Sequence, residues 1–184
     1  MAGIGHNNGP TMERGATWRK TAWTKARAEL LPNLPLEVLR LRVARAKALG
    51  LPYKTYASVR AASGHDVIGF LFSSNALRVL RQAEGIAPEL AERIARIDGA
   101  DRVALLQGKA GAGQLCPPCD AAFVAPSPWA TFAQQRDGLV QVLRERGLSR
   151  NGTVIVGDTS QERDWCLAAR AAGLLRTEVM FGTP

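Results

Sequence analysis

The stretch Val67-Ile68-Gly69-Phe70-Leu71-Phe72 contains no charged or polar side chain. A strand with one face in water alternates apolar and polar residues, whereas a strand covered on both faces is apolar throughout. The stretch therefore predicts a strand in the interior of a sheet that has helices on both of its faces.

Four more apolar runs of strand length follow, the last of them the weakest: 103–106, 121–124, 153–156 and 178–181. The intervening residues predict helices at about 75–97, 128–146 and 161–172. Strands that alternate with helices are typical of parallel sheets. We therefore predict an α/β fold, a Rossmann-like three-layer parallel sheet over residues 66–184, preceded by a small basic helical module.

The chain has 184 residues and a formal net charge of +8, which is unevenly distributed. Residues 1–60 carry 11 Lys and Arg against 3 Asp and Glu, which gives +8, and residues 61–184 carry 13 of each, which gives zero. A one-sided positive charge indicates an anionic partner. We expect nucleic acid or an acidic protein surface to contact residues 1–60. A merely solvated basic face is the alternative.

The basic third is predicted to be a tail followed by helices. Residues 1–16 are rich in Gly and Asn without an apolar period, so a flexible tail is expected. Residues 17–64 predict a module of three helices, with Gly50 as the turn between the second and the third and Pro52 at the start of the third. The apolar stripe of the second helix is predicted on Leu36, Leu39, Val43 and Ala46.

The turn at Gly50 resembles the helix-turn-helix signature of bacterial DNA-binding proteins. Ala46 stands four residues before the glycine, and aliphatic Leu51 follows it. The resemblance implies a recognition helix in the major groove and a preceding helix near the phosphates. The groove-facing residues that it implies are Lys54, Thr55, Ser58 and Arg60, and the phosphate contacts are Arg40, Arg42 and Arg45. The alternative is a helical hairpin packed on the α/β core, and the sequence leaves both open.

Polar residues follow two of the predicted strands. Ser73 and Asn75 come after the first strand, and Asp158 and Thr159 come after the fourth. The carboxyl ends of parallel strands meet at one edge of a sheet, where open α/β folds bind ligands. We therefore predict that these four residues converge on a small anionic ligand. Capping of the following helix is the alternative for Asn75.

Two short motifs resemble those of enzymes. Gly157-Asp158-Thr159 is similar to the fourth motif of haloacid-dehalogenase-type phosphatases, in which the Asp holds a magnesium ion. However, Ser73-Ser74-Asn75 stands where that family has its Asp-x-Asp nucleophile. Without the nucleophile the phosphoryl group has no acceptor, so this activity is not expected. Residues 72–78 also resemble a turn of uroporphyrinogen-III synthases, which are longer, two-lobed enzymes.

Cys116 and Cys119 form a Cys-x-x-Cys pair in a predicted loop. Structural zinc needs four ligands, and the chain offers only Cys166, His6 and His65 besides. Zinc shared across a homodimer and a redox-sensitive loop both stay open, and we assign no metal site and no cofactor. No apolar run approaches the roughly 18 residues that a membrane span needs. A cytoplasmic protein is therefore expected.

These features favour nucleic-acid binding, in a regulatory protein whose α/β domain senses a ligand or contacts another protein. A small or degenerate α/β enzyme acting on a phosphorylated or carboxylated metabolite is the second hypothesis. An assembly protein that docks a basic arm on an acidic partner is the third. No catalytic residue is predicted, because the chain offers no convincing pair of nucleophile and base.

Overall fold

The computed structural model describes residues 34–79, 85–107 and 117–182. The chain divides into two compact units, Met1–Leu39 and Arg40–Pro184. All strands among the described residues belong to the second unit. The predicted tail at 1–16 and the predicted helix at 17–31 lie outside the described residues.

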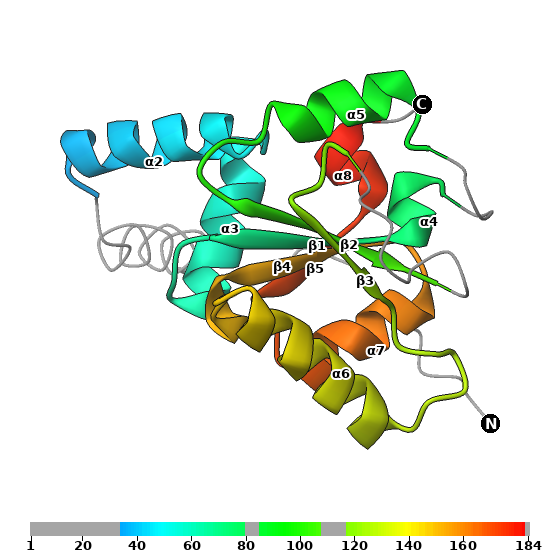
Figure 1. Ribbon diagram of the computed structural model, residues 1–184. Coiled ribbons are helices and arrows are strands. Elements are labelled where there is room, and N and C mark those ends of the chain that lie inside the picture. The colour runs from blue at the N-terminus through cyan, green and yellow to red at the C-terminus, as the bar shows by residue number, and fades with distance from the viewer. Residues whose placement is uncertain (1–33, 80–84, 108–116, 183–184) are drawn as a thin grey trace, which may run out of the picture. The chain divides into compact units, whose positions relative to one another are not determined.

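The second unit is built on a sheet of five parallel strands (Figure 1). In spatial order the strands are β3 (Ala121–Val124), β2 (Asp101–Leu106), β1 (Gly69–Ser73), β4 (Thr153–Val156) and β5 (Gly173–Leu175). In the central register, Leu71 of β1 pairs with Val103 of β2 and with Ile155 of β4. The predicted α/β class and its Rossmann-like three-layer arrangement are confirmed.

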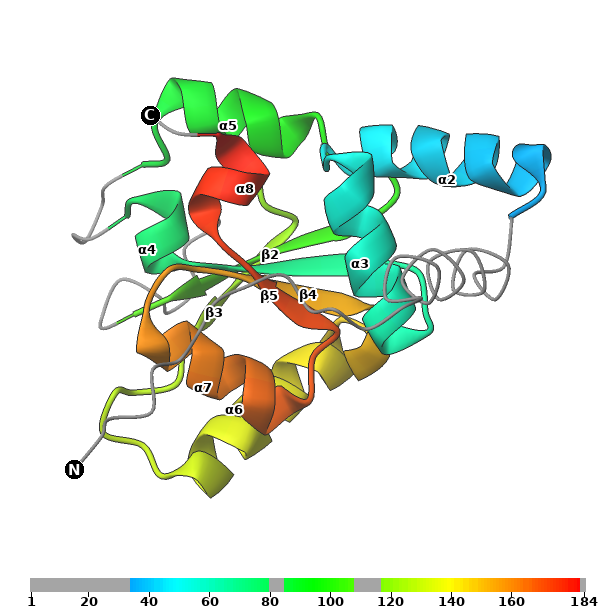
Figure 2. The same ribbon diagram turned by 180° about the vertical axis from the view of Figure 1, so that it is seen from behind.

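Helices cover both faces of the sheet (Figures 1 and 2). One face carries α3 (Tyr53–Ser63), α4 (Ser74–Leu77), α5 (Pro88–Ala95), α8 (Thr177–Phe181) and the end of α2 (Leu36–Ala48). The other face carries α6 (Phe132–Glu145) and α7 (Ser160–Ala169). Residues of β1 alternate between the two cores, since Phe70 and Phe72 join the first and Leu71 the second. Each is fully buried, as the apolar run predicts.

The weakest predicted strand is wrong. Residues 178–181 form most of α8, a short helix in which the neighbours Met180 and Phe181 are both buried. Successive strand residues point to opposite faces, so a single helical turn buries this adjacent pair better than an edge strand would. The fifth strand is β5, which begins at Gly173, where a helix end was expected.

The hairpin of α2 and α3 has the predicted turn. Gly50 adopts a left-handed φ of 68°, and its neighbour Leu51 donates its backbone N–H to Ala46 O at 2.9 Å. This is the Schellman arrangement, which glycine adopts without steric cost. The predicted apolar stripe of α2 is largely wrong, because Leu36 and Val43 are 60% and 45% exposed.

The hairpin is not a separate module. Ala46, Leu49, Tyr56 and Val59 are buried in the same core as the side chains of the sheet. The boundary between units falls at Leu39 and Arg40, so the predicted boundary between residues 64 and 66 needs correction. Residues 40–64 fold with the α/β unit because their apolar side chains have no other core to join.

Candidate functional site

The carboxyl ends of β1 and β4 mark the point where the chain changes direction across the sheet. The connection from β1 runs through α4 and α5 to β2 on one side, whereas the connection from β4 runs through α7 to β5 on the other. The two connections cover opposite faces of the sheet. Open α/β folds bind their ligands where such connections part.

A buried carboxylate occupies this point. Glu162, in the first turn of α7, is fully inaccessible to solvent. Its Oε1 accepts a hydrogen bond from Asn75 Nδ2 at 2.9 Å, and its Oε2 accepts from the backbone N–H of Thr159 at 2.8 Å and from the Thr159 hydroxyl. The Ser73 hydroxyl also hydrogen-bonds to this carboxylate. Donors from the ends of both strands therefore surround one negative charge.

The pKa of Glu162 lies below its ordinary value. Burial alone would raise the pKa, because it penalises the charged form, but the hydrogen bonds from Thr159, Asn75 and Ser73 outweigh burial. Gly157, at the end of β4, makes room for the side chain. A Cβ atom at Gly157 would lie 2.8 Å from Glu162 Cβ and Cδ, which is too close. The strand therefore has to end in glycine for the carboxylate to lie against it.

All four predicted ligand residues lie at this edge, but they have different surroundings. Ser73 is fully buried, and its Oγ also accepts from Ala76 N at 3.1 Å. The hydroxyls of Ser73 and Thr159 both hydrogen-bond to Glu162. Ser73 is too deeply buried for its predicted role as a ligand contact, whereas the same role for the exposed Thr159 stays a prediction. Asn75 and Asp158 line a cavity.

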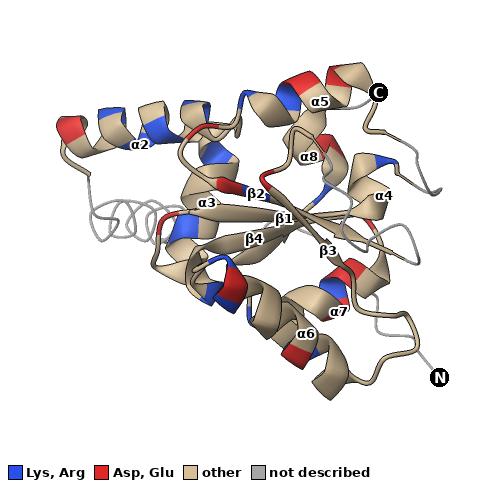
Figure 3. Cartoon of the chain, in the orientation of Figure 1, with Lys and Arg blue, Asp and Glu red and all other residues tan. Residues whose placement is uncertain are grey.

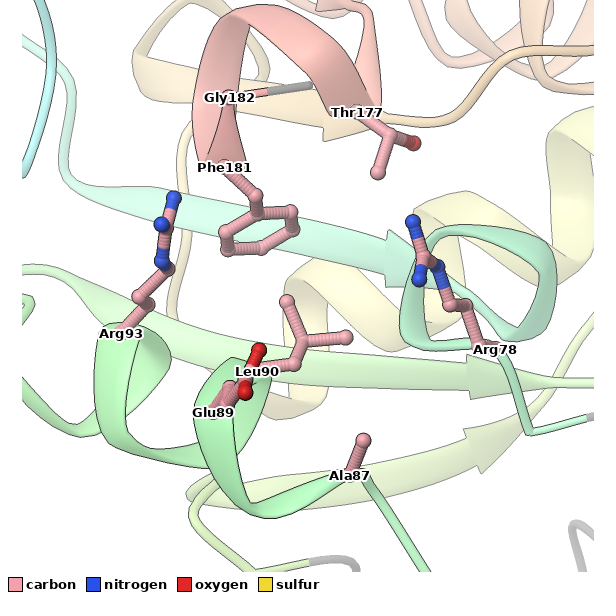
Figure 4. A pocket seen from close by; sticks show the side chains of 8 residues that line it. All are labelled: Arg78, Ala87, Glu89, Leu90, Arg93, Thr177, Phe181 and Gly182. Atoms are coloured by element: carbon pink, nitrogen blue, oxygen red, sulfur yellow. The ribbon is translucent and has the colours of Figure 1, made fainter. Parts of the chain in front are cut away.

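Two adjoining cavities, of about 290 and 250 Å³, open at this edge, and together we call them the carboxyl-edge cleft. They share Arg78, Thr177 and Gly182. The larger cavity is completed by Asn75, Asp158, Arg176 and Glu178, and the smaller by Ala87, Glu89, Leu90, Arg93 and Phe181. In the smaller cavity the two arginines stand on opposite sides of an apolar floor formed by the phenylalanine and the leucine (Figure 4).

Arg78 has an unusual backbone for its residue type. It ends α4 with a left-handed φ of 56°, and its side chain is exposed without an ion pair to any described residue. A left-handed conformation costs a residue other than glycine about 1 kcal/mol, and such strain is often retained at functional sites. The Thr177 Oγ1 atom, in the wall of both cavities, is buried and lacks a hydrogen-bond partner among the described residues.

Two of the predicted nucleic-acid contacts are ion-paired inside the fold. Arg45 Nε donates to Asp66 Oδ2 at 3.0 Å, and Arg60 NH1 lies 3.4 Å from Asp66 Oδ1. Arg45 also donates through NH2 to the backbone oxygens of Val67 and Gly99 at 2.8 and 2.9 Å. These arginines therefore tie the hairpin to the sheet, and their predicted role as contacts to phosphates and bases stays a prediction.

The other predicted nucleic-acid contacts are distributed over α2 and α3. Arg40, Lys54 and Ser58 are exposed, whereas Arg42 and Thr55 are partly buried. Positive residues recur along α2, which also carries Glu37, and α5, α6 and α7 carry both signs (Figure 3).

Sequence reasoning missed the residues around which the site is built. Glu162 had a signal, because Thr159 and Glu162 stand at the capping-box spacing that joins a helix cap to its third residue. Arg78, Arg93 and Arg176 had none, since only the packing of α5 and α8 brings them together.

Other predicted chemistry finds no further support. Cys116 lies outside the described residues, and Cys119 is buried. Residues 34–79, 85–107 and 117–182 contain no cluster of three or more His, Cys, Asp or Glu side chains that could hold a metal ion. Within the same ranges, no helix has the length and apolar character that crossing a membrane requires.

Comparisons with known proteins give no match: no family model, curated protein or solved structure is significantly similar to this chain.

Proposed function

We propose that the α/β unit binds a small molecule that carries a carboxylate or phosphate group, in the carboxyl-edge cleft. The observation that carries the proposal is the position of Arg78, which lines both cavities in a strained backbone conformation and has no ion pair among the described residues. A guanidinium matches carboxylate and phosphate oxygens with paired N–H donors.

The remainder of the cleft limits what kind of molecule fits. Phe181 and Leu90 provide an apolar floor between Arg78 and Arg93, which suits a flat organic group (Figure 4). The orphaned Thr177 Oγ1 would gain a hydrogen bond to a polar atom of the ligand. Glu162 already fills the anion position at the start of α7, so the ligand binds beside that position.

Replacement of Arg78 tests this proposal without damaging the fold. Glycine accepts a left-handed φ, so Arg78→Gly is expected to leave the free energy of unfolding unchanged or raise it by up to about 1 kcal/mol. The same variant is expected to weaken binding of benzoate or phenyl phosphate about tenfold or more in calorimetric titrations. Arg170→Gly is the matched control, because Arg170 also has a left-handed φ, of 52°, but lines neither cavity.

The proposal fails if neither probe binds the wild type, or if Arg78→Gly and Arg170→Gly bind both probes as tightly as the wild type does.

We propose nucleic-acid binding through the first third of the chain as a second function, with ligand binding in the cleft as its regulator. It is favoured by one observation, the confinement of the net charge of +8 to residues 1–60. Among described residues of this third, Arg40, Lys47 and Lys54 have exposed side chains that could reach phosphates.

The salt dependence of DNA binding tests the second function. Fluorescence anisotropy of duplex DNA at several salt concentrations should give a falling line of log K against log salt, and each lost phosphate contact reduces its slope by about 0.9. Arg40→Ala and Lys54→Ala are expected to reduce the slope, and Arg163→Ala, an exposed arginine on α7, is expected to leave it unchanged. Absence of binding at the lowest salt would rule this function out.

A further inference from the structure

A groove lies beside β5, the last strand of the sheet. Its volume is about 480 Å³, and its walls come from β5, from α3 and from the start of α8. Lys54 and Ser58 contribute from α3, Gly173 and Leu175 from the strand, and Arg176 and Val179 from the segment after it. We call this the β5 groove.

The strand itself has one side unpaired within the described residues. β5 pairs only with β4, through Val154 with Gly173 and Val156 with Leu175. The Leu175 backbone oxygen accepts from Gly157 N at 3.0 Å, so the polar groups of Leu175 point to β4. Because backbone groups alternate along a strand, the N–H and C=O of Leu174 point to the open edge. An extended chain is the shape that matches this pair of one donor and one acceptor.

The charges of the groove select the sign of that chain. Lys54 and Arg176 line it, and no described acidic residue does. The chain's own residues 1–33 carry 5 Lys and Arg against 2 Asp and Glu, a net +3, so they would be repelled. A second copy related by a twofold axis would place the same two cations opposite themselves.

We infer that the β5 groove binds an extended acidic segment of a partner protein, which adds to the sheet as a sixth strand beside β5. Backbone hydrogen bonds to Leu174 would hold the segment, and alternate carboxylates would meet Lys54 and Arg176. The apolar side chains, which alternate with the carboxylates, would point to the opposite face of the sheet, the face to which Leu174 of β5 also points. The groove and the ligand cleft share Arg176, whereas Arg78 lines only the cleft and Lys54 only the groove.

Peptide binding to the full-length protein tests the inference. The probe is a fluorescent peptide of about six residues in which Val and Glu alternate, a length that covers β5 and its flanks. The matched probe replaces Glu with Lys, and a third probe carries N-methyl groups on alternate backbone nitrogens. The Val–Glu peptide is expected to bind at least about tenfold more tightly than either of the others.

Two variants locate the binding. A Cβ at Gly173 would meet only Val59 Cγ2, at 4.0 Å, which is an ordinary contact, and the two further methyl groups of Gly173→Val are expected to obstruct the groove and abolish binding. Lys54→Glu combined with Arg176→Glu is expected to reverse the preference toward the Val–Lys peptide. Arg163→Glu, on α7, makes a single charge reversal of the same kind away from the groove and is expected to bind the Val–Glu peptide as the wild type does.

Several results would overturn the inference. Equal binding of the acidic and basic peptides would remove its charge basis, and indifference to N-methylation would exclude strand addition. Tighter binding of a synthetic peptide of residues 17–31 would make the chain's own segment the occupant. If the protein self-associates in sedimentation velocity and Gly173→Val abolishes this association, the occupant of the groove is a second copy of the chain. Unaltered binding in Gly173→Val would place the peptide elsewhere.

Discussion

Glu162→Ala is expected to lower the free energy of unfolding by about 3 kcal/mol, because it removes a fully buried carboxylate and leaves several donors around it without their acceptor. The donors that lose their partner are the Asn75 amide, the backbone N–H of Thr159, and the hydroxyls of Thr159 and Ser73. Urea unfolding at neutral pH measures the loss. Asp164→Ala is the matched control, because Asp164 is exposed on the same helix and is expected to change stability by less than about 0.5 kcal/mol.

The acid limb of the stability curve tests the charge of Glu162. Its pKa in the folded protein lies below the ordinary value of 4.5. The carboxylate therefore contributes its full stabilisation above about pH 4.5, and this contribution is lost as the pH falls through the folded pKa. Glu162→Gln keeps the shape but not the charge, so the difference in stability between wild type and Glu162→Gln should shrink as the pH falls below 4.5. An unchanged difference from pH 6 to pH 3 would show that the pKa of Glu162 is not lowered in the folded protein.

The same site offers a chemical rescue. Glu162→Ala leaves a closed space lined by donors, which a small carboxylate could enter. A ligand that binds only the folded state stabilises it by mass action. Formate is therefore expected to raise the melting temperature of Glu162→Ala but not that of the wild type. A matched response of both proteins would mean that formate acts elsewhere.

The four predicted ligand residues lie at the edge where they were expected, but the prediction left out Glu162, to which several of them hydrogen-bond. Positions after β1 and β4 share one edge in any parallel sheet, so the convergence of Ser73, Asn75, Asp158 and Thr159 follows from topology alone. The sequence pattern does not show that the side chain of Glu162 reaches back from α7 to this edge. A carboxylate from the chain itself takes the position that sequence reasoning gave to a foreign anion.

The apolar runs predicted the sheet well because burial on both faces leaves a plain signal. β1 to β4 were found where continuous apolar residues stood, whereas β5 is only three residues long and begins at a glycine. Short edge strands are set by pairing with a neighbour, and local sequence carries little of that information. The predicted apolar stripe of helix α2 was wrong for a different reason. Its stripe was assigned by period, but Arg45, not Val43, is on the side that faces the sheet.

Asp66→Ala is expected to cost about 2 kcal/mol of unfolding free energy, an estimate reduced for the partial exposure of the site. Asp66 joins three side chains of the hairpin to the start of β1. It accepts from Arg45 Nε at 3.0 Å and from Tyr56 Oη at 2.8 Å, and Arg60 NH1 lies 3.4 Å away. Asp98→Ala is the control, because Asp98 contacts Arg45 through its backbone oxygen only. Thermal and urea unfolding measure both variants.

The pH dependence of this network has two limbs of opposite sign. Burial would raise the pKa of Asp66, but the hydrogen bond from Tyr56 and the charge of Arg45 outweigh it and hold that pKa below its ordinary value. Burial, with the hydrogen bond to Asp66, raises the pKa of Tyr56 above its ordinary value. The carboxylate's contribution is therefore lost toward acid, below about pH 3.8, and the tyrosine's toward alkali, above about pH 10. Asp66→Ala should flatten the acid limb.

A double-mutant cycle decides what Arg45 is for. If Arg45 ties the hairpin to the sheet, Arg45→Ala and Asp66→Ala each lower the free energy of unfolding. The double variant then loses less than the sum of the two losses, because both single variants break the same ion pair. If Arg45 instead contacts phosphates, Arg45→Ala reduces the salt slope of DNA binding while stability stays near that of the wild type. Arg40→Ala is expected to reduce the salt slope without a loss of stability, because Arg40 is exposed without an ion pair to a described residue. A stable Arg45→Ala with a reduced salt slope would therefore support the predicted phosphate contact, and a destabilised variant assigns the arginine to the fold.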